Sequence, residues 1–450
     1  MNFADRFAEI FRRTLPSPFS IAIILTIITF LLAGFLSRPE LPSTEPYVAT
    51  LFHYWYQGFW DAPLMVFAMQ MMLILVLGHI LALSKPIEYI LNHLTRYCTK
   101  TGEAAALVCI LTLLVSFFNW GFGLVLGAIF ARKVAENALI RGYDINYPII
   151  GAAGYSGLMV WHGGLSGSAP IKVAEKGHFL ENELGIISQS ETIFSTMNIS
   201  VSLVLLLLLP LTLYLIGRSS NPLPIIEIKE VHKSPKKKQI GAEKADHSPI
   251  FSKAIGGVIL AYLAYLIFIV PDEFSAAFIN PNLINMLLLG MGLFFYHSIK
   301  EFLDAVDSAI GGASGILIQF PLYFGIMGIM KYSGLTIVLS IFFISISNEQ
   351  TFPFLTMLSA GIINIFVPSG GGQWAVQGPV IAEAVIKLKV LPAKAVMAFA
   401  YGDQLTNMLQ PFWALPLLGI TGLKAKEILP YTIILLLVGI VVFSLGLFLF

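Results

Sequence analysis

Charge is scarce in this sequence. Its 450 residues include only 27 lysines and arginines and 26 aspartates and glutamates. These make up 12% of the chain, well below the ~25% typical of soluble domains. The formal net charge is +1, so the chain has no global positive field to attract nucleic acid. The composition therefore argues against a soluble domain and against a nucleic-acid-binding protein.

Cysteine is also scarce, with Cys98 and Cys109 the only two in the sequence. Both lie in or beside an apolar segment without metal or redox spacing, and we interpret them as ordinary membrane thiols. A membrane-embedded enzyme would use His162, Ser166 and Asp403, but no nucleophile motif or metal-ligand spacing supports that alternative. We therefore expect no catalytic activity, no bound metal and no cofactor apart from a coupling ion.

Apolar residues are what the chain has in excess. They form 57% of it, and the mean hydropathy is +0.81. Apolar runs near the ~20 residues that cross a bilayer core recur along the whole sequence. The clearest are residues 19–36, 62–83, 193–217, 254–270 and 431–450. This pattern predicts an all-α polytopic membrane protein, with membrane lipid as its surroundings.

Positive charge predicts the orientation. Arg6, Arg12 and Arg13 precede the first apolar run, which places the N-terminus in the cytoplasm. No cleavage pattern follows that run, so we expect a retained span followed by an external loop through residue 61. Residues 218–253 form a basic linker containing Lys236, Lys237 and Lys238. We expect a solvated cytoplasmic loop there, with lipid contact by its lysines as the alternative.

Glycine and proline interrupt the apolar pattern in four places. The longest interruption is residues 366–379, where Pro368 and Pro379 bracket three glycines. The other three surround Asn119, residues 161–168 and residues 402–411. Non-helical backbone at membrane depth is tolerated only where it packs in protein or lines a wet cavity. These interruptions therefore predict a solute site.

The same order of segments occurs twice. Ala135 recurs as Ala382, 247 positions later, and Tyr155 as Tyr401, 246 positions later. Basic residues flank segment 103–131 on both sides, which favours a re-entrant helical hairpin that returns to the cytoplasm. We predict an inverted-topology repeat of about nine spanning helices with two such hairpins and broken helices, typical of secondary transporters. Its parts are residues 1–217 with hairpin 103–131, the linker 218–253, and residues 254–450, a connecting span and second repeat with hairpin 351–380.

Four sets of helix ends would meet at the membrane midplane. Helix N-termini present unpaired N–H groups that bind anions, and glycine lets these amides approach a ligand closely. None of the four interruptions contains arginine or lysine, which suits one weak carboxylate better than a dicarboxylate or phosphate. The alternative for the glycines is close helix packing. The predicted anion-binding residues are Asn119, Gly121, Gly123, Ser166, Ser168, Ser369, Gly370, Gly371, Gly372, Gln373, Gln377, Thr406 and Asn407.

Asp403 is the candidate for ion coupling. An ionisable residue at that depth is costly and indicates function. Together with Gln404 it would hold a sodium ion or carry a proton, and the structural alternative is a carboxylate that caps a neighbouring helix. His162, at the equivalent break of the first half, is a second proton carrier or a structural histidine. Tryptophans at the breaks would wall a small apolar substrate or pack the core: Trp120, Trp161, Trp374 and Trp413.

Residues 367–379 resemble the signature of the bacterial short-chain fatty acid transporter family. Similar stretches are 3–7, 116–121, 162–170 and 402–407. The resemblance implies uptake of short-chain monocarboxylates such as acetoacetate or butyrate across the inner membrane. It also implies kinship with the larger ion-transporter group, whose members have paired re-entrant hairpins and are often homodimers. Sodium or proton coupling stays open, and so do a channel and a carrier of another small anion, such as a dicarboxylate carrier or exchanger.

Overall fold

The computed structural model describes residues 16–37, 46–223, 243–270 and 281–450, and these ranges form helices without a strand. Within them, seven helices are long and apolar enough to cross a membrane. The prediction of an all-α polytopic membrane protein is thus confirmed. Arg6, Arg12, Arg13 and the run Lys236 to Lys238, used to predict orientation and the linker, lie outside the described residues.

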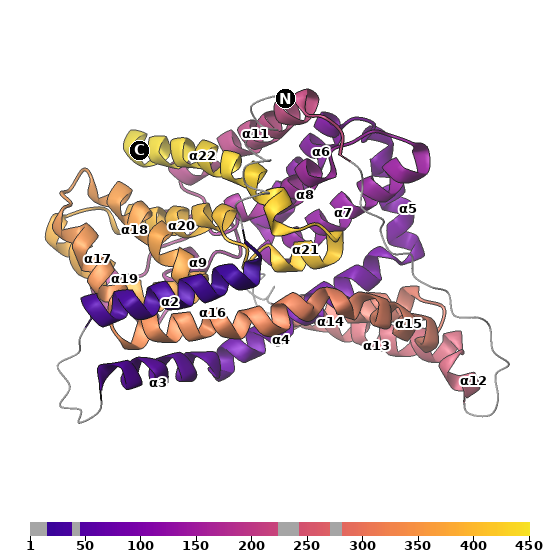
Figure 1. Cartoon of the computed structure of the whole chain (residues 1–450), viewed down its shortest axis with the longest axis horizontal. Helices are drawn as coiled ribbons and strands as arrows, with labels where there is room; N and C mark the ends of the chain where they lie inside the picture. Colours follow the sequence, from indigo (N-terminus) through magenta and orange to yellow (C-terminus); the bar gives the residue numbers. More distant parts are fainter. Residues whose placement is uncertain (1–15, 38–45, 224–242, 271–280) are drawn as a thin grey trace.

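The chain consists of two similar series of elements (Figure 1). The first series is α2 (Pro18–Leu36), α3 (Tyr47–Phe59), α4 (Ala62–Ala82), α5 (Lys85–Leu94), α6 (Thr101–Phe118), α7 (Trp120–Arg141), α8 (Tyr147–Tyr155), η2 (Ser156–Met159), α9 (Ser168–Lys172), α10 (Glu181–Leu184) and α11 (Thr196–Ser219). Between the series lie α12 (Glu243–Asp246) and α13 (Pro249–Phe268). The second series is α14 (Pro281–Phe295), α15 (Ile299–Ala309), α16 (Ser314–Tyr332), α17 (Leu335–Ser345), α18 (Phe352–Phe366), α19 (Gly370–Leu388), α20 (Pro392–Thr406), η5 (Asn407–Leu409), α21 (Leu415–Thr421) and α22 (Ala425–Leu449).

Each series contains a pair of helices separated by a very short tip. Asn119 alone separates α6 from α7, and its Oδ1 accepts a hydrogen bond of 3.0 Å from the backbone N–H of Phe122. Residues 367–369 separate α18 from α19, and Ser369 Oγ accepts one of 3.2 Å from the N–H of Gly372. Short polar side chains favour this N-cap position because they satisfy a donor that the helix leaves unpaired. The same local chemistry therefore forms both tips.

The second arm of each pair runs past its predicted boundary. Helix α7 continues to Arg141 and α19 to Leu388, whereas residues 131 and 380 were the expected ends. The charged residues near these predicted boundaries do not end the helices, because they form ion pairs with one another along one face of the helix. In α7, the Glu136 carboxylate forms ion pairs with Arg132 Nε at 2.8 Å and with Lys133 Nζ at 2.7 Å.

Helices of each series pack on helices of the other. Helices α2 and α3 of the first series pack on α16 of the second, and α14 and α15 pack on α4 in return (Figure 1). The short helix α9 packs on α19 and α20, while its counterpart α21 packs on α7 and α8. Each series thus contributes helices that pack on the other.

Helix α3 lies within the segment that we expected to be an external loop. It packs closely on α16, where a Cβ added to Gly58 would lie 2.3 Å from the carbonyl oxygen of Phe324. Its apolar side chains were too few for a span, so hydropathy did not distinguish it from a loop. The segment is a helix because its buried face has a partner far along the chain.

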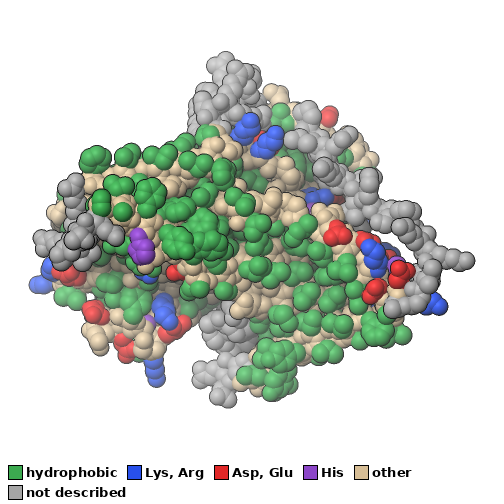
Figure 2. All heavy atoms as spheres, turned by 60° about the horizontal axis from the view of Figure 1, so that its bottom comes forward, with side chains coloured by type: hydrophobic (Ala, Val, Ile, Leu, Met, Phe, Trp, Pro, Cys, Tyr) green, Lys and Arg blue, Asp and Glu red, His purple; other side chains and the backbone are tan. Residues whose placement is uncertain are grey.

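The outer surface is strongly apolar. Hydrophobic side chains cover most of the face in Figure 2, and charged ones gather toward its two ends. Only 17% of the apolar window of α2, and the same share of that of α13, is buried inside the protein. Large exposed apolar surfaces of this kind are rare in soluble monomers, whereas lipid is a suitable solvent for them. These helices are therefore suited to face lipid.

Both cysteines are free and buried. Cys98 lies between α5 and α6, where burial and then the Glu103 carboxylate raise the pKa of its thiol to about 12. Since the thiolate is the reactive form, this thiol is unreactive at neutral pH.

Candidate functional site

The second tip lies against the break between α8 and α9. A Cβ added to Gly370 would lie 2.8 Å from His162 Cε1, 3.0 Å from Trp161 Cη2 and 3.2 Å from Ser168 Oγ. The next residue, Gly371, has more room, since its nearest neighbour is Ser168 at 3.8 Å. Only glycine fits this approach at residue 370. The structure thus brings Gly370 together with His162 and Ser168, which lie far from it in the sequence.

The first tip contacts the same break from another direction. The backbone N–H of Trp120 donates to Ser166 Oγ at 3.0 Å, and the N–H of Leu165 donates to the carbonyl of Phe117 at 2.8 Å. The break at residues 161–168 is therefore in contact with both tips. Asn119 and Ser166, both predicted from the sequence, belong to this contact region.

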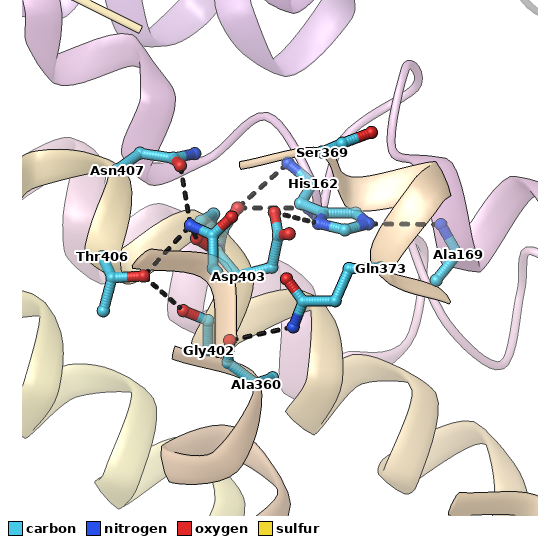
Figure 3. A network of polar contacts seen from close by, with 12 residues as sticks. His162, Ala169, Ala360, Ser369, Gln373, Gly402, Asp403, Thr406 and Asn407 are labelled. Atoms are coloured by element: carbon cyan, nitrogen blue, oxygen red, sulfur yellow. Dashed lines mark hydrogen bonds and ion pairs between the residues drawn. The ribbon is translucent and has the colours of Figure 1, made fainter. Parts of the chain in front are cut away.

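His162 and Asp403 form a buried pair between the two broken helices (Figure 3). His162 Nδ1 lies 2.9 Å from Asp403 Oδ1, and the side chains are 0% and 1% exposed. The backbone N–H of Ala169 donates to His162 Nε2 at 3.2 Å. An accepting Nε2 carries no proton, so Nδ1 bears the hydrogen and donates it to Asp403. The imidazole is thus held as one neutral tautomer.

The Gln404 side chain links the second break to the backbone of the first break. Its Oε1 accepts from the N–H of His162 at 3.0 Å and from that of Gly163 at 3.4 Å. Asp403 and Gln404, neighbours on α20, therefore bind the side chain and the main chain of the first break. The predicted ion-coupling residues Asp403, Gln404 and His162 lie in direct contact.

Three acceptor oxygens near this pair have no hydrogen-bond donor among the described residues. They are Asp403 Oδ2, Asn364 Oδ1 and Gln373 Oε1. Figure 3 shows the Gln373 side chain extending toward the Asp403 carboxylate. A buried acceptor left unpaired costs free energy because it has lost its water without replacement. A group of such oxygens is chemically suited to a proton or a small hard cation.

Asn364 is a member of the site that sequence reasoning missed. Its Nδ2 donates to the carbonyl of Asp403 at 2.7 Å, to Thr406 Oγ1 at 3.0 Å and to Asn407 Oδ1 at 2.9 Å. It thereby fastens α18 to the second broken helix. The available signal was an asparagine within the mostly apolar helix α18, since polar residues at membrane depth are costly.

Several predicted substrate residues instead hold the site together. Thr406 Oγ1 donates to the carbonyl of Gly361 at 2.9 Å, and the carbonyl of Asn407 accepts from Tyr155 Oη at 2.8 Å. Gln377 Nε2 donates to Ser359 Oγ at 3.0 Å, while its Oε1 accepts from Gln373 at 3.0 Å. The side-chain groups of Thr406 and Gln377 are thus occupied, whereas Asn407 Nδ2 has no hydrogen-bond partner among the described residues. Contact of all three residues with substrate stays a prediction.

Two predicted glycines at the first tip also have packing neighbours. A Cβ on Gly123 would lie 1.9 Å from Ser116 Oγ, which is too close for any side chain. Gly121 has ordinary neighbours, the nearest at 3.6 Å. Close helix packing, the alternative reading, therefore accounts for Gly123.

A chain of aromatic rings links the breaks and the first tip. Trp120 lies 5.1 Å from Trp413 and 6.0 Å from Trp161, measured between ring centroids. Trp161 stacks on His162 at 4.5 Å with an interplanar angle of 19°. Trp374 joins through Phe399, at 5.0 Å. The predicted tryptophans thus form one connected apolar wall beside the polar pair.

The two equivalent tyrosines brace the breaks. Tyr401 Oη donates to Asn198 Oδ1 at 3.1 Å, and Asn198 Nδ2 donates to the carbonyl of Gly163 at 2.8 Å. Tyr155, as noted, bonds Asn407 of the other break. The sequence repeat matched these two tyrosines to each other. It did not reveal that the tyrosine of each series is hydrogen-bonded, directly or through Asn198, to the break of the other series.

Comparison with known proteins gives a consistent family. The family model described as "Short chain fatty acid transporter" matches residues 2–450. A protein of Escherichia coli K12 that carries short-chain fatty acid transport in its name is 37% identical, covering 100% of this chain and 99% of that protein. A similarly named protein of Haemophilus influenzae is 35% identical, covering 96% of each. Among solved structures, the chain is similar to the YdaH transporter of Alcanivorax borkumensis, with a TM-score of 0.45 at 15% identity over 96% of this chain and 98% of that one.

Proposed function

This chain belongs to the short-chain fatty acid transporter family, and from that premise we propose that it is a secondary active carrier of short-chain monocarboxylates such as acetoacetate or butyrate. As a member of the family it is a multi-pass membrane transporter of short-chain acids and not an enzyme. The proposal adds the choice of monocarboxylate, the coupling to an ion and the site that binds both.

The carboxylate binds at the second tip, where α19 begins. The first N–H groups of a helix have no partner within it and carry partial positive charge. Gly371 is exposed and leaves its amide open, whereas Ser168 and His162 face the buried Gly370 from the first break. The close approach of this glycine tip to the break is the observation that carries the proposal. Without an arginine or lysine at the breaks, such a site holds one negative charge weakly enough to release it.

The coupling ion binds at Asp403. A proton on Oδ2 would turn an unpaired acceptor into a donor, whereas a sodium ion would draw on the oxygens of Asp403, Asn364 and Gln373. Because His162 already donates to Oδ1, either ion would arrive on the opposite side of the carboxylate. The site therefore supports ion coupling and leaves two candidates, proton and sodium.

The membrane arrangement that we propose is an inverted repeat. Its two helix pairs, α6 with α7 and α18 with α19, would enter the membrane from opposite sides and return, so that both tips lie near the midplane. Reciprocal packing of the two series supports the twofold relation. The N-terminus would lie in the cytoplasm, the membrane would be the bacterial inner membrane, and two copies would form the dimer that the family resemblance implies.

An ion-swap uptake assay tests the function. Protein in liposomes is given labelled butyrate or acetoacetate with an inward proton gradient, an inward sodium gradient, or neither. We expect saturable accumulation driven by one of the two gradients. Uptake that is equal under all three conditions would exclude the coupled carrier and indicate a uniporter or exchanger. Stronger competition by a dicarboxylate than by butyrate would favour the alternative, a carrier of another small anion.

A further inference from the structure

A cavity of about 220 Å³ lies beside the second tip. The junction of α3 and α4, the end of α16 and the start of α17 form one side. The tip forms the other side through Val367, Gly372, Gln373 and Val376. Its volume is below the ~300–1,000 Å³ of pockets for drug-sized ligands, which suits a molecule of a few carbon atoms.

Lys331 brings a positive charge to this cavity. It lies in the last turn of α16, is exposed, and lines the cavity. Within the described ranges no carboxylate lies close enough to form an ion pair with it, and its recorded contact is the Tyr332 ring, 5.3 Å from Nζ to the ring centroid. Asp61 also lines the cavity, but its Oδ1 caps α4 by accepting from the N–H of Leu64 at 3.1 Å. The ammonium group is thus available to an anion.

The remaining lining completes a site for an aliphatic acid. Leu64, Met327 and Val376 supply an apolar wall. Gln373 also lines the cavity with a fully buried side chain, whose unpartnered Oε1 is an acceptor and therefore does not bind the carboxylate itself. The cavity therefore has a cation and a helix-capping carboxylate in its lining, hydrocarbon along its wall, and the glycine tip of α19 beside it.

We propose that this cavity is an access subsite, in which Lys331 binds the carboxylate of a short-chain acid before the acid reaches the glycine tip. The inference rests on the proposed function, because it assigns a second binding step to the same substrate. The ammonium attracts the anion and makes a charge-assisted hydrogen bond, while the alkyl chain lies against Met327 and Val376. A strong cation placed outside the breaks selects anions without trapping them at the tip.

Kinetics with two substitutions at one position test the subsite. For Lys331→Gln we expect the KM of butyrate uptake to rise about tenfold, as expected for the loss of one charge-assisted hydrogen bond. Lys331→Arg keeps the charge and should stay within about threefold of the unmodified protein. Lys253→Gln, an exposed lysine on α13 that does not line the cavity, is the matched control. The increase of KM with salt should also be smaller in Lys331→Gln, because screening then acts on one charge fewer.

Chemical protection gives a readout that is independent of transport. In a Cys98→Ser, Cys109→Ser background, Val376→Cys places a thiol in the cavity wall. Butyrate should slow its modification by a small thiol reagent, and adding Lys331→Gln should remove that protection. Unchanged KM in Lys331→Gln together with unchanged protection would overturn the subsite while leaving the carrier intact. Failure of the unmodified protein to take up any short-chain acid would instead overturn the proposed function.

Discussion

At the scale of single residues, His162 and Asp403 are two buried ionisable side chains in direct contact. Both side chains are almost fully buried, and each has one hydrogen-bonding direction already fixed by the other or by the backbone. Asp403 Oδ2 is the part of the carboxyl that stays without a partner among the described residues. A buried charge needs a partner or a proton to offset its lost hydration. This oxygen is consequently the natural place for an ion that enters and leaves.

Asp403→Asn tests the coupling role. The amide keeps the size of the side chain and removes both its charge and its capacity to take up a proton. We expect the ion gradient to lose its effect on butyrate uptake, while gradient-independent exchange of butyrate persists at a reduced rate. Glu383→Gln, a substitution of an exposed carboxylate paired with Lys387, should leave coupling unchanged. An Asp403→Asn protein with wild-type ion dependence would remove Asp403 from coupling.

At the scale of elements, the three glycines at the beginning of α19 have different structural roles. Gly370 has no space for a Cβ between His162, Trp161 and Ser168, whereas Gly371 meets nothing closer than 3.8 Å. Gly372 donates its N–H to the capping hydroxyl of Ser369. Adjacent glycines therefore serve contact with the first break, exposure of an amide and capping of the helix.

A pair of alanine substitutions separates these tasks. Gly370→Ala should lower the initial uptake rate about tenfold or more, because its methyl group pushes the tip away from the break by a few tenths of an ångström or more. Gly371→Ala should lower the rate less than Gly370→Ala, since both changes favour helix equally and its methyl group meets nothing closer than 3.8 Å. Thermal unfolding of the purified variants checks that both fold. Equal uptake by the two variants would contradict the assigned contact.

At the scale of the whole molecule, reciprocal packing joins the two series into one body. Each series lends a short helix to the other: α9 packs on α19 and α20, and α21 on α7 and α8. Each also supplies a tyrosine that braces the partner series, Tyr155 through Asn407 and Tyr401 through Asn198. The proposed binding region therefore lies where the series meet, and neither series contains it alone.

Sided cysteine labelling tests the inverted repeat. Thr99, before α6, and Gln350, before α18, are exposed and occupy equivalent places in the two series. In the Cys98→Ser, Cys109→Ser background, Thr99→Cys should react only from the cytoplasmic side and Gln350→Cys only from the outside. A membrane-impermeant thiol reagent applied to cells and to inverted vesicles distinguishes the sides. Labelling of both positions from one side would refute the inversion and leave a parallel repeat.

Local sequence properties were enough to predict the class and the positions of the four interruptions, although the longest shrinks from residues 366–379 to residues 367–369 because α19 begins at Gly370. The ion-coupling role of Asp403, Gln404 and His162 stays a prediction. Hydropathy over about twenty residues decides whether a helix can face lipid. Glycine and proline favour an interruption because their effects on φ, ψ and backbone donors act at the residue itself, although Pro379 lies inside α19. Asp403 stood out for the same reason, since a lone carboxylate in an apolar run is costly wherever the run packs.

Only the tertiary structure decided which of these residues meet. His162 and Asp403 are 241 positions apart, and nothing local indicates that one ring nitrogen bonds one carboxylate. Packing gave Asn364 its three acceptors and used the polar groups of Gln377 between helices. It also placed Lys331 beside the tip. Such contacts depend on the directions of several helices at once, and a side chain's own chemistry sets what it can bind but not what it will face.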